Sequence, residues 1–265
     1  MTNSSMRRTT CCTPEPRIWL LLLLLFTWPA SAGQIALIID DIGARASDRA
    51  AFALPTDVTL SFLPHTPYGR ELALKAWRQG RETMLHLPMA TRGPKDPGPW
   101  AIGPDQDAWQ VSYRVKKALA DIPFTSGVNN HMGSAITPDS EVMAWVMAEL
   151  QQGNRFFVDS LTTPDSQAYY QAEAAGVASI KRDVFLDPMP GRMIIERQWR
   201  QAVSLAQSRG QVVVIGHPYP STLAFLQEAL PALAQQGVTL VPVSRLVRPA
   251  GLPLPVQTAQ QAPAH

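Results

Sequence analysis

The chain has 265 residues, of which 46% are hydrophobic and 17% are charged, and it contains 24 prolines, 16 glycines and 2 cysteines. This apolar fraction excludes a disordered or low-complexity protein, and the length fits one α/β barrel of about 250 residues or two smaller domains. The formal net charge is only +2. Because the sequence has no run of lysine or arginine, we expect no binding of nucleic acid through its phosphates.

The N-terminal segment has the pattern of a secretory signal peptide. Three arginines precede the uncharged apolar run 18–28, and Ala-Ser-Ala follows it at 30–32. This order predicts a signal peptide at 1–32 that is cleaved after Ala32, and therefore a periplasmic or secreted protein. The alternative is an uncleaved anchor, which would be the chain's only contact with a membrane. Both cysteines lie in this segment, so a metal in the mature protein would be held by histidines and carboxylates.

Apolar, β-branched runs alternate with helical patterns along the rest of the chain. The predicted strands are 34–40, 58–63, 82–87, 125–131, 156–160, 179–186, 211–216 and 238–243. The predicted helices are 45–53, 67–79, 107–120, 138–152, 164–175, 193–209 and 220–236. A threonine–proline pair marks the start of two of these helices, and a glycine follows five of them, as capping preferences require.

Strict alternation of strands and helices indicates parallel strands joined by right-handed crossover connections. The runs 34–39 and 212–215 are almost wholly apolar, which is typical of strands covered on both faces. We therefore predict an α/β fold over residues 33–247, a single distorted barrel of seven or eight mostly parallel strands. An open doubly wound sheet is the alternative. No glycine-rich loop follows the first strand, so we expect no nucleotide cofactor.

Two segments depart from the alternation. Residues 90–106 form a long loop rich in proline and glycine after the third strand. In a barrel this loop belongs to the carboxyl-terminal face, where it could line a site. Residues 248–265 are rich in proline, alanine and glutamine, which predicts a disordered tail.

Polar residues that can bind a metal stand where the apolar strands end. The first strand ends in Asp40 and Asp41, the third contains His86, the fourth ends in His131, and His217 follows the seventh. The ends of parallel barrel strands converge on one face, where catalytic residues lie. The sequence therefore predicts one site built from these five side chains.

Each of these residues also has a purely structural interpretation. The two adjacent aspartates could cap the next helix, although neighbouring carboxylates repel each other unless a cation or a proton intervenes. His86 alone could be a hydrogen-bonded core histidine. Asp159 either accepts a hydrogen bond from a histidine or caps the next helix, and His65 is interpreted as a loop residue. Asn130 and Asp159 are further candidates for contacting substrate or supporting the ligands.

The chemistry of these residue types favours a hydrolytic metal site. Catalytic zinc usually has three protein ligands of the histidine and carboxylate types and one open position. Asp41, His86 and His131 can supply these ligands to one divalent metal, with zinc as the first choice. Asp40 could then act as a general base and His217 as a general acid, which suits hydrolysis of an amide or an ester.

Five segments carry a resemblance to a known family. They are IALIIDDIG at 35–43, LHLPM at 85–89, GVNNHMGS at 127–134, FFVDSLT at 156–162 and VVVIGHP at 212–218. In this order they resemble the divergent polysaccharide deacetylases, a bacterial secreted or periplasmic branch of the NodB-like carbohydrate esterases. The resemblance implies a distorted (β/α) barrel, a divalent metal that is usually zinc, and removal of N-acetyl groups from an N-acetylated polysaccharide or a peptidoglycan-type glycan.

The resemblance also assigns roles by position. It implies that Asp40 is the catalytic base, Asp41 a metal ligand and His217 the acid. NodB-like enzymes generally have two histidines four residues apart, whereas no histidine follows His86 at that spacing. We therefore assign the second histidine ligand to His131. The arginine-containing motif of the larger family is not evident.

Two other functions fit the same residues. The first is a deacetylase-like barrel that has little or no turnover and binds a glycan or a partner in the cell envelope, and the altered histidine motif favours it. The second is a metal-dependent esterase or phosphoesterase with the same ligands.

Overall fold

The computed structural model describes Met1 and residues 32–247. Apart from Met1 and Ala32, the predicted signal peptide lies outside the described residues, and so does the predicted tail at 248–265. Among the residues described, no helix is both long enough and apolar enough to cross a membrane.

In the described part of the chain, strands alternate with helices as the sequence pattern predicts, except where two short strands follow each other at 179–185. The strands are β1 (Gly33–Ile42), β2 (Thr59–Phe62), β3 (Thr83–Met89), β4 (Gly127–Met132), β5 (Phe156–Asp159), β6 (Ser179–Lys181), β7 (Val184–Phe185), β8 (Gln211–Gly216) and β9 (Val238–Leu240). The α-helices are α1 (Gly69–Arg78), α2 (Ala108–Asp121), α3 (Ser140–Gln152), α4 (Ala168–Ala174), α5 (Arg192–Arg209) and α6 (Pro220–Ala229). Four 3₁₀-helices complete the elements: η1 (Ala46–Ala53), η2 (Leu230–Ala232), η3 (Ala234–Gln236) and η4 (Val243–Arg245).

The strands form one curled sheet in which all neighbours are parallel. The order is β6-β5-β4-β3-β2-β1-β8-β7, and β9 pairs with the first residues of β1. The two ends of this order, β6 and β7, are separated in the chain by only Arg182 and Asp183. A single segment therefore pairs with β5 through its first half and with β8 through its second half, which brings the two edges of the sheet together. The prediction of a distorted, mostly parallel (β/α) barrel is confirmed.

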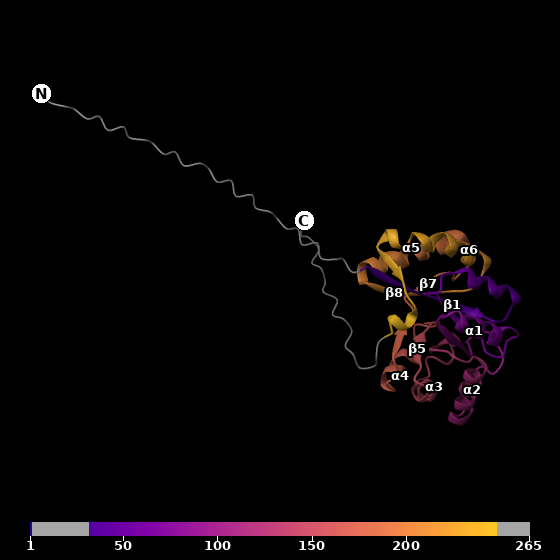
Figure 1. The fold of residues 1–265 in the computed structure, drawn as a ribbon. Coiled ribbons are helices and arrows are strands. Elements are labelled where there is room, and N and C mark those ends of the chain that lie inside the picture. The colour runs from indigo at the N-terminus through magenta and orange to yellow at the C-terminus, as the bar shows by residue number, and fades with distance from the viewer. Residues whose placement is uncertain (2–31, 248–265) are drawn as a thin grey trace. The chain divides into compact units, whose positions relative to one another are not determined.

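Alternate residues of each strand point to opposite faces of the sheet, which separates two hydrophobic cores. The larger core lies between the strands and the helices, and Figure 1 shows α5 and α6 on the opposite side of the strands from α2, α3 and α4. The smaller core contains side chains from β1, β3, β5 and β8, together with Val243 and Leu246. Four strands separate β5 from β8 in the strand order. Because β5 can meet β1 and β8 only across the barrel, the smaller core fills its interior.

Five predicted elements differ from those observed in type or by three residues or more. Strand β9 ends at Leu240 rather than at residue 243. The predicted strand 179–186 is divided into β6 and β7, and the predicted helix 45–53 is the 3₁₀-helix η1. Helix α6 ends at Ala229 rather than residue 236, because Pro231 has no N–H group with which to continue an α-helix. Helix α4 begins at Ala168 rather than at residue 164, because Ser166 donates a hydrogen bond to Asp159 and holds the preceding residues in a turn.

Candidate active site and metal centre

The inward-facing residues of the barrel change from apolar to polar toward the carboxyl ends of the strands. On β1 the inward series runs Ala36, Ile38, Asp40, and on β3 Met84 is followed by His86. The register pairs His86 with Asn129 on β4. The apolar members occupy the barrel interior, so the polar members are stacked directly above them. The period-2 geometry of the strands therefore builds a buried polar site on an apolar floor.

Three of the five predicted side chains meet at one point. Oδ1 of Asp41 lies 2.9 Å from Nδ1 of His131 and 3.2 Å from Nε2 of His86. The two imidazole nitrogens are 3.2 Å apart. Three potential ligand atoms from three different strand ends thus form a small triangle.

The residues fit a divalent cation. Ligand atoms about 2.0–2.1 Å from a tetrahedral zinc ion lie about 3.3 Å from one another, which is close to the spacings of this triangle. Oδ1 of Asp41 is buried and has no hydrogen-bond partner within the described part of the chain. A buried carboxylate oxygen is costly to leave unpaired, and a cation would satisfy it. Two imidazoles and one carboxylate suit zinc better than magnesium or calcium, which prefer oxygen ligands alone.

The end of β1 is distorted so that consecutive aspartates serve the same site. Asp41 has a φ of 58°, in the left-handed region, and the pairing of β1 with β2 shifts register between Ile39 and Ile42. Neighbouring residues of a regular strand would point to opposite faces. Aspartate tolerates the left-handed conformation better than most residues, and such outliers concentrate at functional sites.

Asn129 connects the catalytic and metal-binding candidates. Its Nδ2 donates to both carboxylate oxygens of Asp40, at 2.9 and 3.0 Å, and its Oδ1 lies 2.9 Å from Nδ1 of His86. Ser61 donates to the same Oδ1 at 2.6 Å. An amide oxygen can only accept, so Nδ1 of His86 carries a proton, and a metal beside Asp41 would bind this imidazole through Nε2. An outer partner of this kind fixes the orientation of a metal-binding imidazole.

Asp40 is a buried carboxylate beside this triangle. It is 2% exposed, and its Oδ2 lies 3.6 Å from Nε2 of His86. Burial raises the pKa of Asp40, although the charges of His86 and His217 and the hydrogen bond from Asn129 partly offset this effect. For Asp41, burial also favours the neutral form, but the two imidazoles beside it hold its pKa well below the usual range. The adjacent aspartates are thus differentiated: Asp40 is the more basic carboxylate.

His217 enters the site from the other side of the barrel, after β8. Its Nε2 lies 3.8 Å from Oδ2 of Asp41, and its Nδ1 lies 2.9 Å from Oδ1 of Asp187. Oδ2 of Asp187 accepts hydrogen bonds from the backbone N–H of His217 and the hydroxyl of Thr222. Burial lowers the pKa of His217, but the hydrogen bond to Asp187 and the charge of Asp41 outweigh it and raise the pKa to about 9. His217 is therefore protonated at neutral pH, as a general acid must be.

The remaining predicted residues lie near the site without facing the triangle. The side chain of Asn130 accepts from the backbone N–H of Ser160 and donates to the carbonyl of Met132. Asp159 accepts from the backbone N–H of Leu161 and from Ser166, so its bonds hold the loop after β5 and none of them reaches a histidine. His65 lies in the turn after β2, as its interpretation as a loop residue required.

Three functional candidates were not singled out from the sequence. Asn129 and Asp187 orient His86 and His217, and the guanidinium of Arg182 donates to the carbonyls of Ser160 and Leu161 at the edge of the site. Burial lowers the pKa of Arg182, whereas the charges of Asp159 and Asp40 raise it. Asp187 follows a predicted strand, as the other site residues do, and that signal could have found it.

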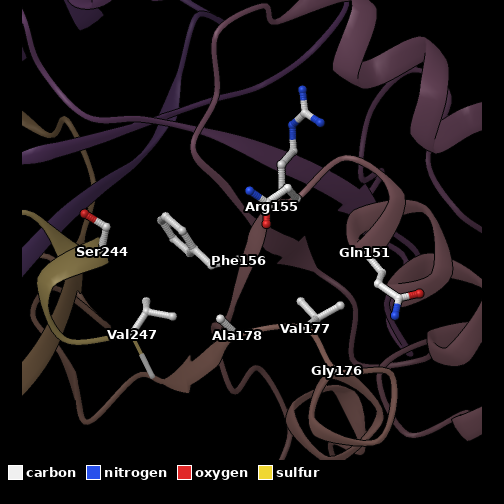
Figure 2. Close-up of a pocket in the computed structure, with 9 residues that line it drawn as sticks. Gln151, Arg155, Phe156, Gly176, Val177, Ala178, Ser244 and Val247 are labelled. Atoms are coloured by element: carbon white, nitrogen blue, oxygen red, sulfur yellow. The ribbon is translucent and has the colours of Figure 1, made fainter. Parts of the chain in front are cut away.

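A cavity of 580 Å³ lies at the other ends of the strands (Figure 2). Its lining residues are Gln151, Asn154, Arg155, Phe156, Gly176, Val177, Ala178, Ser244 and Val247. Phe156 is the first residue of β5 and Ala178 precedes β6, so the cavity lies at the amino-terminal edge of the sheet. It has no carboxylate or imidazole in its lining and is therefore not a candidate for the chemistry above.

One family model covers most of the described part of the chain. The family model described as divergent polysaccharide deacetylase matches residues 37–247. The chain belongs to the divergent polysaccharide deacetylase family. All five polar residues predicted from strand ends lie within the matched region, and the resemblance inferred from the sequence is confirmed.

Relatives of this family member include uncharacterized proteins from two bacteria. YibQ of Escherichia coli K12 is 35% identical over 226 residues, covering 85% of this chain and 70% of YibQ. A protein of Haemophilus influenzae is also 35% identical, over 81% of this chain and 77% of its own.

Solved structures share the fold. An uncharacterized protein from Agrobacterium tumefaciens C58 has a TM-score of 0.79 at 23% identity, covering 83% of this chain and 91% of that protein. A mutant of a CE4 family pseudoenzyme has a TM-score of 0.50 at 13% identity, covering 82% of this chain and 68% of that protein.

Proposed function

We propose that this protein is a metal-dependent hydrolase that removes N-acetyl groups from an amino-sugar polysaccharide, a reaction at a carbon–nitrogen bond that is not a peptide bond. The observation that carries this proposal is the convergence of Asp41, His86 and His131 between a basic carboxylate and a protonated imidazole. Membership of the polysaccharide deacetylase family supports the reaction type.

Asp41, His86 and His131 would hold the divalent cation, for which zinc is our first choice. Such a cation supplies Lewis acidity toward a carbonyl group and increases the acidity of a water molecule. Asn129 keeps Nε2 of His86 directed at the site, where His86 is buried and Asp41 and His131 are half-buried.

Two side chains transfer protons in the proposed reaction. Asp40 takes a proton from the water whose oxygen attacks the acetyl carbon. His217 gives a proton to the amide nitrogen as the carbon–nitrogen bond breaks, which releases acetate and leaves a free amine on the sugar. Asp187 holds Nδ1 of His217, so the proton that is transferred is the one on Nε2.

The proposed substrate is an N-acetylated polysaccharide or a peptidoglycan-type glycan. The signal-peptide pattern of residues 1–32 supports an encounter with such a polymer in the periplasm or outside the cell.

The test is acetate release from chitooligosaccharides and soluble peptidoglycan fragments by the zinc-loaded protein. Asp40→Asn should abolish release while the protein keeps one bound metal ion, because Asp40 is beside the triangle and not part of it. Asp165→Asn, a change in an exposed ion pair with Arg92, serves as the matched control. Metal-loaded wild type that releases no acetate from any acetylated glycan would contradict the proposal.

The second candidate is a barrel that binds a glycan or an envelope partner without turnover. It is favoured by the absence of a histidine four residues after His86 and by the shared fold of a CE4 family pseudoenzyme. Binding of glycan that is unchanged by Asp40→Asn and His217→Ala, with no acetate from wild type, would select this function.

A further inference from the structure

A group of exposed aromatic rings lies on the loop after β3 and on the first turns of α2. It consists of Trp100, Trp109 and Tyr113, which we call the aromatic row, and these residues are 45%, 71% and 40% exposed. A packed aromatic side chain buries about 150–250 Å². Three such side chains left accessible in one place indicate an interaction surface rather than scattered apolar residues.

The rings of the aromatic row are in contact with one another. Trp109 and Tyr113 are one helical turn apart on α2, and their rings are stacked with centroids 5.4 Å apart and planes at 8°. The ring of Trp100 lies 6.0 Å from that of Tyr113. Nζ of Lys117 lies over the rings of Trp100 and Tyr113, 5.9 Å and 5.8 Å from their centroids. The row is therefore a preorganised surface of flat rings with a cation beside it.

Trp100 is held in a backbone conformation that bulky residues rarely adopt. Its φ is 61°, in the left-handed region, which is a strained conformation for a residue with a large side chain. The guanidinium of Arg114 donates to the carbonyl of Ala101 and lies 5.7 Å from the Trp100 ring. Strain of this kind persists where the surrounding structure fixes it, commonly at ligand sites.

The aromatic row begins next to the carboxyl-terminal end of β3, the end of the strands at which the candidate active site lies. The backbone N–H of Ile102 donates to the carbonyl of Pro88 near the end of β3, and Pro88 pairs in register with His131. The ring of Trp100 also lies near that of His65, in the turn after β2, with 6.1 Å between the ring centroids. A polymer chain that enters the site can therefore continue over Trp100 onto α2.

We propose that the aromatic row binds sugar rings of the same glycan chain whose reacting residue occupies the candidate active site, and this inference rests on the proposed function. The C–H face of a pyranose ring packs against a flat aromatic ring, while its hydroxyl groups stay available to water and to polar side chains. The exposed residues around the row include five polar ones, Asp105, Asp107, Gln110, Lys116 and Lys117, beside the small apolar residues Pro99, Pro104 and Ala108. These surroundings suit a hydroxylated ligand better than an apolar peptide or the interior of a membrane.

The experiment measures binding of chitohexaose to the full-length, zinc-loaded protein by calorimetry, with Asp40→Asn in every sample so that the probe is not consumed. The variant is Trp109→Ala combined with Tyr113→Ala. The control is Trp77→Ala, which removes another exposed tryptophan, 47% exposed, whose ring stacks on that of Phe124 at 4.2 Å at the end of α1. We expect the dissociation constant to rise at least tenfold in the double variant and to stay unchanged in the control. Equal affinity in all samples, or an equal loss in the control, would overturn the proposal.

A second variant separates the ring from the fold. Trp100→Gly removes the aromatic side chain and places at φ 61° the one residue that accepts this conformation without strain. We expect a melting temperature at or above that of the parent protein together with weaker chitohexaose binding. Unchanged binding would overturn the proposal.

The outcomes also distinguish this inference from the proposed function. Chitohexaose binding that depends on the aromatic row, without acetate release by the protein with Asp40 intact, would retain the inference and reject the deacetylase activity. Acetate release with a KM unaffected by the double variant would do the reverse. Loss of binding to phosphatidylglycerol vesicles, with chitohexaose binding intact, would assign the row to a membrane surface and overturn the proposal.

Discussion

Replacing Asp187 with asparagine should move the alkaline limit of activity to lower pH. In the structure the carboxylate of Asp187 accepts a hydrogen bond from Nδ1 of His217 at 2.9 Å. Burial lowers the pKa of His217, but this hydrogen bond and the charge of Asp41 have the larger effect and raise the pKa to about 9. An imidazole acts as a general acid only while protonated, so activity is present below this pKa and is lost as pH rises through it.

The size of the shift follows from the bond that is lost. A hydrogen bond to a charged group contributes about 1.5–3 kcal/mol, and one pKa unit corresponds to about 1.36 kcal/mol. The neutral amide of Asp187→Asn should therefore lower the pKa of His217 by about 1–2 units, to between about 7 and 8. With a pKa of about 7.5, the protonated fraction at pH 8.5 falls about eightfold relative to wild type.

The assay is the pH dependence of kcat/KM for acetate release from a chitooligosaccharide, measured from pH 6 to pH 10. An NMR titration of the His217 ring reports the same pKa without relying on turnover. Asp165→Asn should leave both curves unchanged, since that carboxylate pairs with Arg92 on the surface. An alkaline limb that stays near pH 9 in Asp187→Asn would refute the assignment of His217 as an acid tuned by Asp187.

Four further outcomes follow from the site. Asp40→Asn should lower kcat by about 10²–10⁴-fold at unchanged metal content, and metal loss in this variant would contradict its role as a base. Ala at either His86 or His131 should abolish stoichiometric zinc in a metal analysis; full occupancy in both would reject the triangle. Asn129→Ala should weaken zinc affinity about 10–100-fold in a chelator competition, because the orientation of His86 is lost, and equal affinity would argue against that role. Zinc at 100 times its dissociation constant should stabilise the fold by about 2.7 kcal/mol, so a chelator should lower Tm in calorimetry, and an unchanged Tm would count against binding.

Much of the fold follows from local patterns. The apolar runs of β1 and β8 and the glycines after the helices are properties of short segments, so the alternation of strands and helices is readable from the sequence. The same holds for Asp40, Asp41, His86, His131 and His217, because the carboxyl ends of parallel strands lie on the same face of a barrel.

The features that the sequence did not reveal depend on partners far away in the chain. Asn129 is important because it lies across from His86 in the register of β3 and β4, and Asp187 because β7 pairs with β8. The prediction of one strand at 179–186 hid this second pairing, although the charged residues Lys181, Arg182 and Asp183 interrupt the apolar pattern where β6 ends and β7 begins. The positive φ of Asp41 is likewise set by tertiary contacts rather than by residue type.

The cation ligands and the residue that orients the acid are held by different strands, and this separation has an evolutionary consequence. The cation ligands and the base are anchored on β1, β3 and β4, which pair over several residues, whereas Asp187 depends on the two-residue strand β7. Loosening of this short closing segment would disconnect proton delivery while leaving the cation in place. A descendant could thus lose turnover and keep its ligand affinity through changes confined to residues 179–187, without any substitution among the histidines.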